Sequence, residues 1–270
     1  MKLRRKLSLS TSLALSLAWL SVATPPLSAQ PAQAAAAPPQ ITDPAALGLL
    51  EANPSTPQQL VQAVDTLLAL GYPTAAAPLV KQLLDARMDD ATCYALVQQF
   101  GSDTFMRLNR QPSVEGASQL AMYVLTGASR YAVDPARLND LIDKIATGDN
   151  VARLAYAEEL RTAGPAGVNA LLAALVDPNR RDQQTALYQA LLLQGSNAIG
   201  PCLAALDAPN QQTRAFAAQA LGALKSRKAV PYLAGPAVDA TVDPQFRAAA
   251  QEAMQNLLGA VPSRDEVVGY

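Results

Sequence analysis

Two pairs of adjacent carboxylates are the side chains of this sequence that most clearly invite chemistry. Each pair, Asp89-Asp90 and Glu158-Glu159, could supply a general acid together with a general base. Both pairs fall at or within predicted helices. There, Asp89-Asp90 favour a helix N-terminus through capping and the helix dipole, and Glu158-Glu159 are typical of a solvated helical stripe. We therefore prefer the structural interpretation for both pairs.

Other reactive residues are scarce. The 270-residue sequence has no histidine, which excludes Ser-His-Asp and Cys-His nucleophile pairs and histidine-ligated zinc. It also lacks a phosphate-binding G-x-x-x-x-G-K-[ST] loop, a G-x-S-x-G nucleophile motif and a C-x-x-C pair. Cys93 and Cys202 could form one disulfide in an exported chain, but their separation favours two small buried residues, and the sequence leaves their redox state open. We predict no catalytic, cofactor-binding or metal-binding residues and no enzymatic activity.

The second half of the chain repeats itself with a period of about 31 residues. Arg153, Gln184, Arg214 and Arg247 follow one another at spacings of 31, 30 and 33. Spacings of three, four and seven residues place positions on one face of a helix. Apolar or aromatic residues recur three and seven positions after each anchor: Tyr156, Leu187, Ala217 and Ala250, then Leu160, Leu191, Leu221 and Met254. Six positions after the anchors, three of the four residues are alanine and the fourth is Glu159.

A break and a second apolar stretch complete each repeat. The second stretches begin near Val168, Ile199 and Val230 and end at an aspartate close to a turn. Neither helix of such a unit can bury its apolar face alone, so we predict an all-α protein whose antiparallel helix pairs stack into an α-solenoid. The boundary aspartates are expected to cap the next helix, or to pair with an arginine one turn later, as in Asp149–Arg153 and Asp243–Arg247.

The run Arg-Ala-Phe-Ala-Ala-Gln-Ala-Leu-Gly-Ala-Leu at 214–224 is similar to the first helix of a HEAT repeat, and the short period resembles the phycocyanobilin-lyase type of HEAT-like repeat, here expected in an exported bacterial protein. This resemblance covers residues 149–259 and implies a fold rather than an activity. Gln184 departs from the arginine usual in the family. Deoxyhypusine hydroxylase has similar repeats but uses histidine and glutamate metal ligands, and bilin lyases act on cytoplasmic pigment proteins.

Residues 45–147 are predicted to be helical in a different register and precede the HEAT-like repeats at 148–260. Amphipathic patterns at 57–71 and 74–86 predict a helical hairpin that resembles a tetratricopeptide unit. Residues 261–270 contain Pro262-Ser263-x-x-Glu266, which is typical of a helix start. We therefore expect the last segment to be the truncated start of a further helix, completed by a longer polypeptide or by another chain.

Residues 1–34 have the layout of a secretory signal peptide. Four basic residues precede an apolar run of about 17 residues, and cleavage motifs end at Ala29 and Ala34. An Ala/Pro-rich flexible leader is expected at 35–44. Removing the four basic residues from the 21 leaves 17 against 22 acidic ones, a net charge of −5. This charge disfavours nucleic acids as partners, and no span is expected to cross a membrane after cleavage.

Together these features predict an exported scaffold, periplasmic or extracellular, that binds another protein through its solenoid surface. The candidate partner-binding residues are Arg214, Arg247, Tyr156 and Tyr188, although the aromatic ones also fit a core position. The alternatives are a non-catalytic part of a longer enzyme, whose active site lies beyond the C-terminus, and a purely structural spacer. The identity of the partner, the curvature and the oligomeric state are not predicted.

Overall fold

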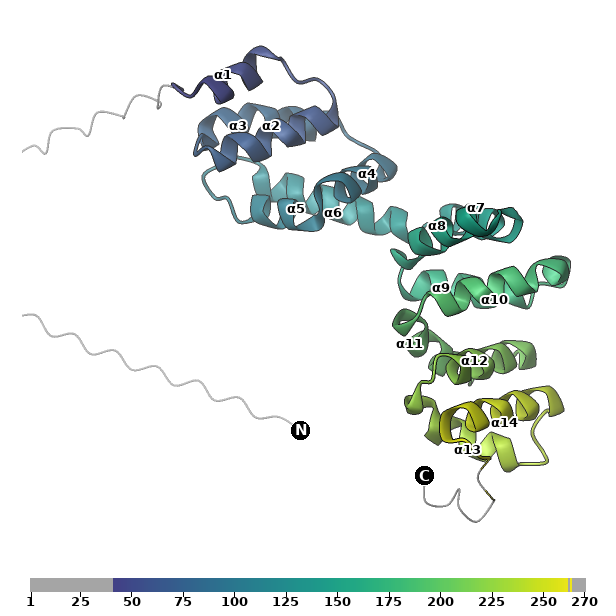
Figure 1. Ribbon diagram of the computed structural model, residues 1–270. Helices are drawn as coiled ribbons and strands as arrows, with labels where there is room; N and C mark the ends of the chain where they lie inside the picture. The colour runs from purple at the N-terminus through teal and green to yellow at the C-terminus, as the bar shows by residue number, and fades with distance from the viewer. Residues whose placement is uncertain (1–40, 262, 264–270) are drawn as a thin grey trace, which may run out of the picture. The chain divides into compact units, whose positions relative to one another are not determined.

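The computed structural model describes residues 41–261 and 263, and every regular element in that part is an α-helix or a short 3-10 helix. Neighbouring helices pack against one another in chain order, which confirms the predicted all-α solenoid (Figure 1). The predicted signal peptide, the first six leader residues and most of the expected C-terminal helix start lie outside the described residues. Among the described helices, none combines the length and the apolar composition needed to cross a membrane.

The first helices enclose one hydrophobic core, which extends from Ala46 to Ala128. A capping box between Thr56 and Gln59 opens the second helix, which packs on the third as the predicted hairpin. The first helix begins at Pro44, after Asp43 caps it and Ile41 packs on the core, so the last residues of the expected leader are ordered. The helices of this region are α1 (Pro44–Glu51), α2 (Pro57–Ala69), α3 (Pro73–Asp85), α4 (Asp90–Phe100), α5 (Ser102–Asn109) and α6 (Ala117–Ala132).

The repeats enclose a second core, which extends from Leu138 to Leu257. Their helices stack in successive pairs along the chain (Figure 1). These elements are α7 (Pro135–Thr147), α8 (Asn150–Arg161), α9 (Pro165–Leu175), η1 (Pro178–Gln183), α10 (Gln184–Leu193), α11 (Ser196–Ala205), α12 (Gln211–Ala223), η2 (Arg227–Ala229), α13 (Val230–Val238) and α14 (Pro244–Leu258).

The turns inside the three repeats each contain a residue with a positive φ angle. Gly164 has φ 55°, Gly195 has φ 57° and Lys225 has φ 52° at the corresponding break. A positive φ costs glycine little, whereas for other L-residues the side chain crowds the following carbonyl. In the third repeat Lys225 thus adopts a positive φ at the break where the first two repeats carry glycine.

The repeat boundaries are held by caps and by side chains that reach backward. Asp149 accepts a hydrogen bond from the amide of Ala152, and Asp243 accepts from the amides of Gln245 and Phe246. The predicted capping is confirmed at these two helices, whereas at α12 the cap is Asn210 instead of Asp207.

The predicted Asp149–Arg153 and Asp243–Arg247 ion pairs are wrong. Arg153 donates from Nε to the carbonyl of Ile145 at 3.1 Å, and Arg247 donates from Nη1 to the carbonyl of Ala240 at 3.0 Å. Gln184 reaches back in the same way, to the carbonyl of Leu175 at 2.8 Å. The amide of glutamine can thus replace arginine here, because the position needs a hydrogen-bond donor rather than a charge.

The two cores meet at Arg137, a buried arginine near the start of α7. Its guanidinium lies over the ring of Tyr94 in α4 at 4.6 Å and donates to the Tyr94 hydroxyl at 2.8 Å. It also pairs with Glu159 of α8 at 3.1 Å and donates to the carbonyl of Ala132. One side chain therefore ties the N-terminal helices to the first repeat.

Candidate partner-binding site

The two carboxylate pairs are engaged in structural contacts. Asp89 caps α4 by accepting from the amide of Thr92, and Asp90 accepts two hydrogen bonds from Arg130 of α6, at 2.7 and 2.9 Å. These bonds lower the pKa of both Asp89 and Asp90 below the usual range. A general acid at neutral pH needs a raised carboxyl pKa, so this pair is arranged in the opposite sense.

The second pair is divided between two arginines. Glu158 pairs with Arg161 on the same helix, whereas Glu159 pairs with the buried Arg137. The predicted solvated stripe therefore describes Glu158 but not Glu159.

The cysteines are both buried and free, as we predicted from their separation. Burial raises the pKa of the Cys93 thiol to about 11 and that of the Cys202 thiol to about 12. A thiol with so high a pKa stays protonated and unreactive at neutral pH. Within the described residues, no group of three or more Cys, Asp or Glu side chains is placed to hold a metal ion.

A surface hollow of about 490 Å³ surrounds Arg214, one of the predicted partner-binding residues. It lies among α12, α13, α14, the turn that precedes α12 and the turn that precedes α14, so it belongs to the edge of the repeats where consecutive units join. Phe246 and Val242 are among its apolar lining residues, and Tyr232 and Asp207 line it as well.

Arg214 is held by an aromatic ring instead of a carboxylate. Its guanidinium lies 5.1 Å from the centre of the Phe246 ring, and its buried Nε has no hydrogen-bond partner. Unlike Arg153 and Gln184, it donates to no carbonyl of the preceding helix within the described part of the chain. The stacking orients the cation while leaving its hydrogen-bonding capacity unused.

The other predicted residues divide into two groups. Arg247 lies one turn into α14 and does not line the hollow; its Nη1 donates to the carbonyl of Ala240. Tyr156 and Tyr188 are half-buried against the repeat core, Tyr156 beneath Lys144 and Tyr188 against Phe216. Burial raises the pKa of Tyr188 to about 12. The structure thus places Arg214 in the hollow, Arg247 outside its lining and the two tyrosines against the repeat core.

Tyr232 was not among the predicted residues, yet it is the most exposed aromatic side chain described, at 56%. A signal for it exists in the sequence. Val230, Leu233, Ala234 and Ala237 are buried at helical spacing, and Tyr232 falls outside that face. An aromatic residue off the apolar face of a helix is a candidate for contact with a partner.

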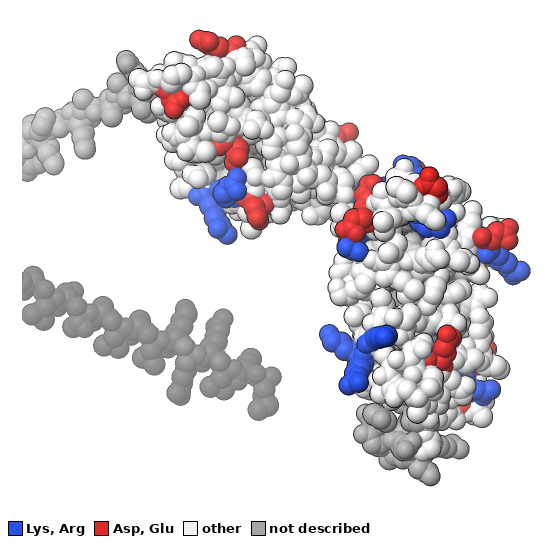
Figure 2. All heavy atoms as spheres, viewed as in Figure 1, with Lys and Arg blue, Asp and Glu red and all other residues white. Residues whose placement is uncertain are grey.

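The charged side chains on the surface in view are interspersed, with basic groups next to acidic ones and wide uncharged areas between them (Figure 2). Nucleic-acid recognition depends on a continuous basic surface, which this face does not offer. Recognition here would depend on individual side chains such as Arg214 and Tyr232.

Comparison with known proteins identifies one family. Residues 168–255, from α9 to most of α14, match the family model for HEAT repeats. No curated protein gives a significant match to the chain. The HEAT-repeat character of this segment is therefore established, and the hollow around Arg214 lies inside it.

Proposed function

We propose that the protein is an exported, non-catalytic scaffold that binds a protein partner at the repeat edge formed by Arg214, Tyr232 and Phe246. HEAT repeats are typical of protein-interaction scaffolds, because stacked helix pairs offer a long surface for contact. Export is inferred from the signal-peptide pattern of residues 1–34.

The observation that carries the proposal is the unpaired guanidinium of Arg214, stacked on Phe246 beside the exposed Tyr232. Tyrosine and arginine are enriched among the residues that dominate binding energies at protein interfaces. A partner carboxylate or carbonyl can accept from Arg214, while an apolar side chain covers Tyr232. The partner class is thus a protein segment that presents an acceptor next to an apolar residue.

Capture from the proteins of the chain's own export compartment tests the proposal. The substitutions Tyr232→Ser and Arg214→Gln should each reduce the recovery of a specific partner at least fivefold. Val151→Ser is the matched control, since Val151 is 80% exposed on α8 and far from the hollow in sequence. Equal recovery by all three variants would contradict the proposal.

A further inference from the structure

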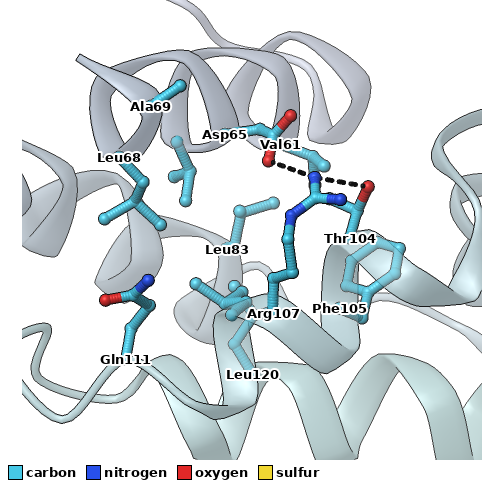
Figure 3. Close-up of a pocket in the computed structure, with 12 residues that line it drawn as sticks. Val61, Asp65, Leu68, Ala69, Leu83, Thr104, Phe105, Arg107, Gln111 and Leu120 are labelled. Atoms are coloured by element: carbon cyan, nitrogen blue, oxygen red, sulfur yellow. Dashed lines mark hydrogen bonds and ion pairs between the residues drawn. The ribbon is translucent and has the colours of Figure 1, made fainter. Parts of the chain in front are cut away.

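A second hollow, of about 320 Å³, opens in the N-terminal helical region, outside the matched repeats. It lies among α2, α3, α5 and α6 (Figure 3). Its floor is formed by side chains of the hydrophobic core, including Val64, Leu83, Phe105 and Leu120, each at most 3% exposed. Protein interiors are close-packed, so a hollow of this size that reaches core side chains is unusual.

The rim of this hollow is charged on one side only. Arg107 of α5 extends across to Asp65 of α2, with Nη2 3.0 Å from Oδ1, and the same nitrogen lies 3.3 Å from the hydroxyl of Thr104 (Figure 3). Leu68 and Gln111 line the opposite side. The hollow therefore combines an apolar interior with a cation at its entrance, which is typical of small-molecule sites.

The Arg107–Asp65 ion pair is exposed, so another carboxylate can compete with Asp65 for Arg107 at little cost in stability. The two side chains are 61% and 44% accessible, and exposed ion pairs contribute little to stability. All the hydrogen bonds of the Arg107 side chain within the described residues come from Nη2, so Nη1 and Nε remain able to donate. A second carboxylate can therefore accept a hydrogen bond from Nη1 or from Nε while Nη2 keeps its contact with Asp65.

We propose that this hollow binds an amphiphilic monocarboxylate, with an unbranched apolar chain against the core side chains and the carboxylate on Arg107. Water is a poor occupant of an apolar interior, because it needs two to four polar partners. The positive charge of Arg107 at the rim favours a negatively charged head group. The site lies outside the repeats, so it is independent of the proposed partner-binding edge.

Calorimetric titration of the full chain with hexanoate, octanoate and decanoate tests the proposal. Each added methylene group should tighten binding about fourfold until the hollow is filled. Octanoate should bind at least tenfold more tightly than octanol or octylamine, because only the carboxylate pairs with Arg107.

Variants assign the binding to this hollow. Arg107→Gln should lower the affinity for octanoate at least tenfold and leave the affinity for octanol unchanged. Asp65→Asn should raise the affinity for octanoate severalfold, because it removes the carboxylate that competes for Arg107. Arg110→Gln is the matched control, because Arg110 is exposed on the same segment and does not line the hollow. Val64→Phe should fill the hollow and abolish binding, with the circular dichroism spectrum showing that the chain is folded.

Two outcomes would overturn the proposal. If octanoate does not bind to the folded wild-type chain at millimolar concentration, the hollow takes no such ligand. If octanol and octanoate bind equally and Arg107→Gln changes neither, the hollow accepts any apolar group, such as a side chain of another protein, and the assigned role of Arg107 is wrong.

Discussion

Glu159 occupies a position at which the other three repeats carry alanine, and the structure explains why. Ala190, Ala220 and Ala253 are fully buried between repeat helices. The neighbour of α8 at this point includes the buried guanidinium of Arg137, which needs an anion. A departure from the repeat pattern thus marks the place where the repeats meet the N-terminal helices.

Replacing Glu159 with alanine should therefore destabilise the protein even though it restores the repeat pattern. We expect Glu159→Ala to lower the free energy of unfolding by about 1–2 kcal/mol, because Arg137 loses its anionic partner while Glu159 is itself partly exposed. Glu158→Ala, which breaks an exposed pair with Arg161, should change it by at most about 0.5 kcal/mol. Urea unfolding of both variants measures the difference, and a stabilising Glu159→Ala would refute this role of Arg137.

The buried thiols should make the stability pH-dependent in the alkaline range. In the unfolded chain a cysteine ionises near pH 8.5, whereas burial raises the pKa of Cys93 to about 11 and that of Cys202 to about 12. Above pH ~8.5 the unfolded state releases protons that the folded state keeps, so stability falls as the pH rises. We expect a loss of about 1 kcal/mol per thiol between pH 7.5 and 9.5.

Urea unfolding across this pH range measures the loss. The variants Cys93→Ala and Cys202→Ala serve as controls, since each should remove the part of the stability loss at alkaline pH that one thiol contributes. A wild-type stability that stays constant up to pH 9.5 would contradict the burial of the thiols.

At the scale of the helices, α12 and α14 approach each other closely at Gly222. A Cβ atom built at Gly222 would lie 2.6 Å from the Cα atom of Ala253 and 2.9 Å from its Cβ atom. The alanine-rich composition predicts such close packing, and the absence of a side chain at Gly222 allows it at this crossing.

Gly222→Ala should lower the free energy of unfolding by about 1–3 kcal/mol, because the new methyl group forces two backbones apart despite the better helix propensity of alanine. Gly200→Ala is the matched control in α11, where nothing lies within 4 Å of the added Cβ atom. It should raise stability by about 0.5–1 kcal/mol. Thermal unfolding distinguishes the two, and equal effects of both substitutions would contradict the close packing of α12 on α14.

For the whole molecule, most of the fold was predictable because it depends on period and turn chemistry. The repeat spacing located the paired helices, and the breaks at Gly164 and Gly195 located the turns between them. The ion pairs predicted for Arg153 and Arg247 were not found, because a long side chain can reach a carbonyl of the preceding helix or turn as readily as a nearby carboxylate.

The candidate site was only partly predictable. Arg214 stood out through its repeat position, but its stacking on Phe246 depends on how two repeats meet in space. The hollow at Arg107 depends on α5, which lies in the region predicted to be helical but whose bounds were not predicted, and on contacts between residues 42 positions apart. Contacts of this kind follow from tertiary packing and leave no local pattern in the sequence.

The most direct measurement of the central claim is photo-crosslinking from the repeat edge. The photoreactive amino acid p-benzoylphenylalanine would replace Tyr232 and, as a control, Met122, which is 54% exposed on α6. The proposal predicts a discrete cross-linked protein from position 232 only, lost on adding excess unlabelled wild-type chain and reduced by Arg214→Gln. Equal cross-linking from both positions, or none from position 232 in the export-compartment extract, would contradict a partner-binding site at this edge.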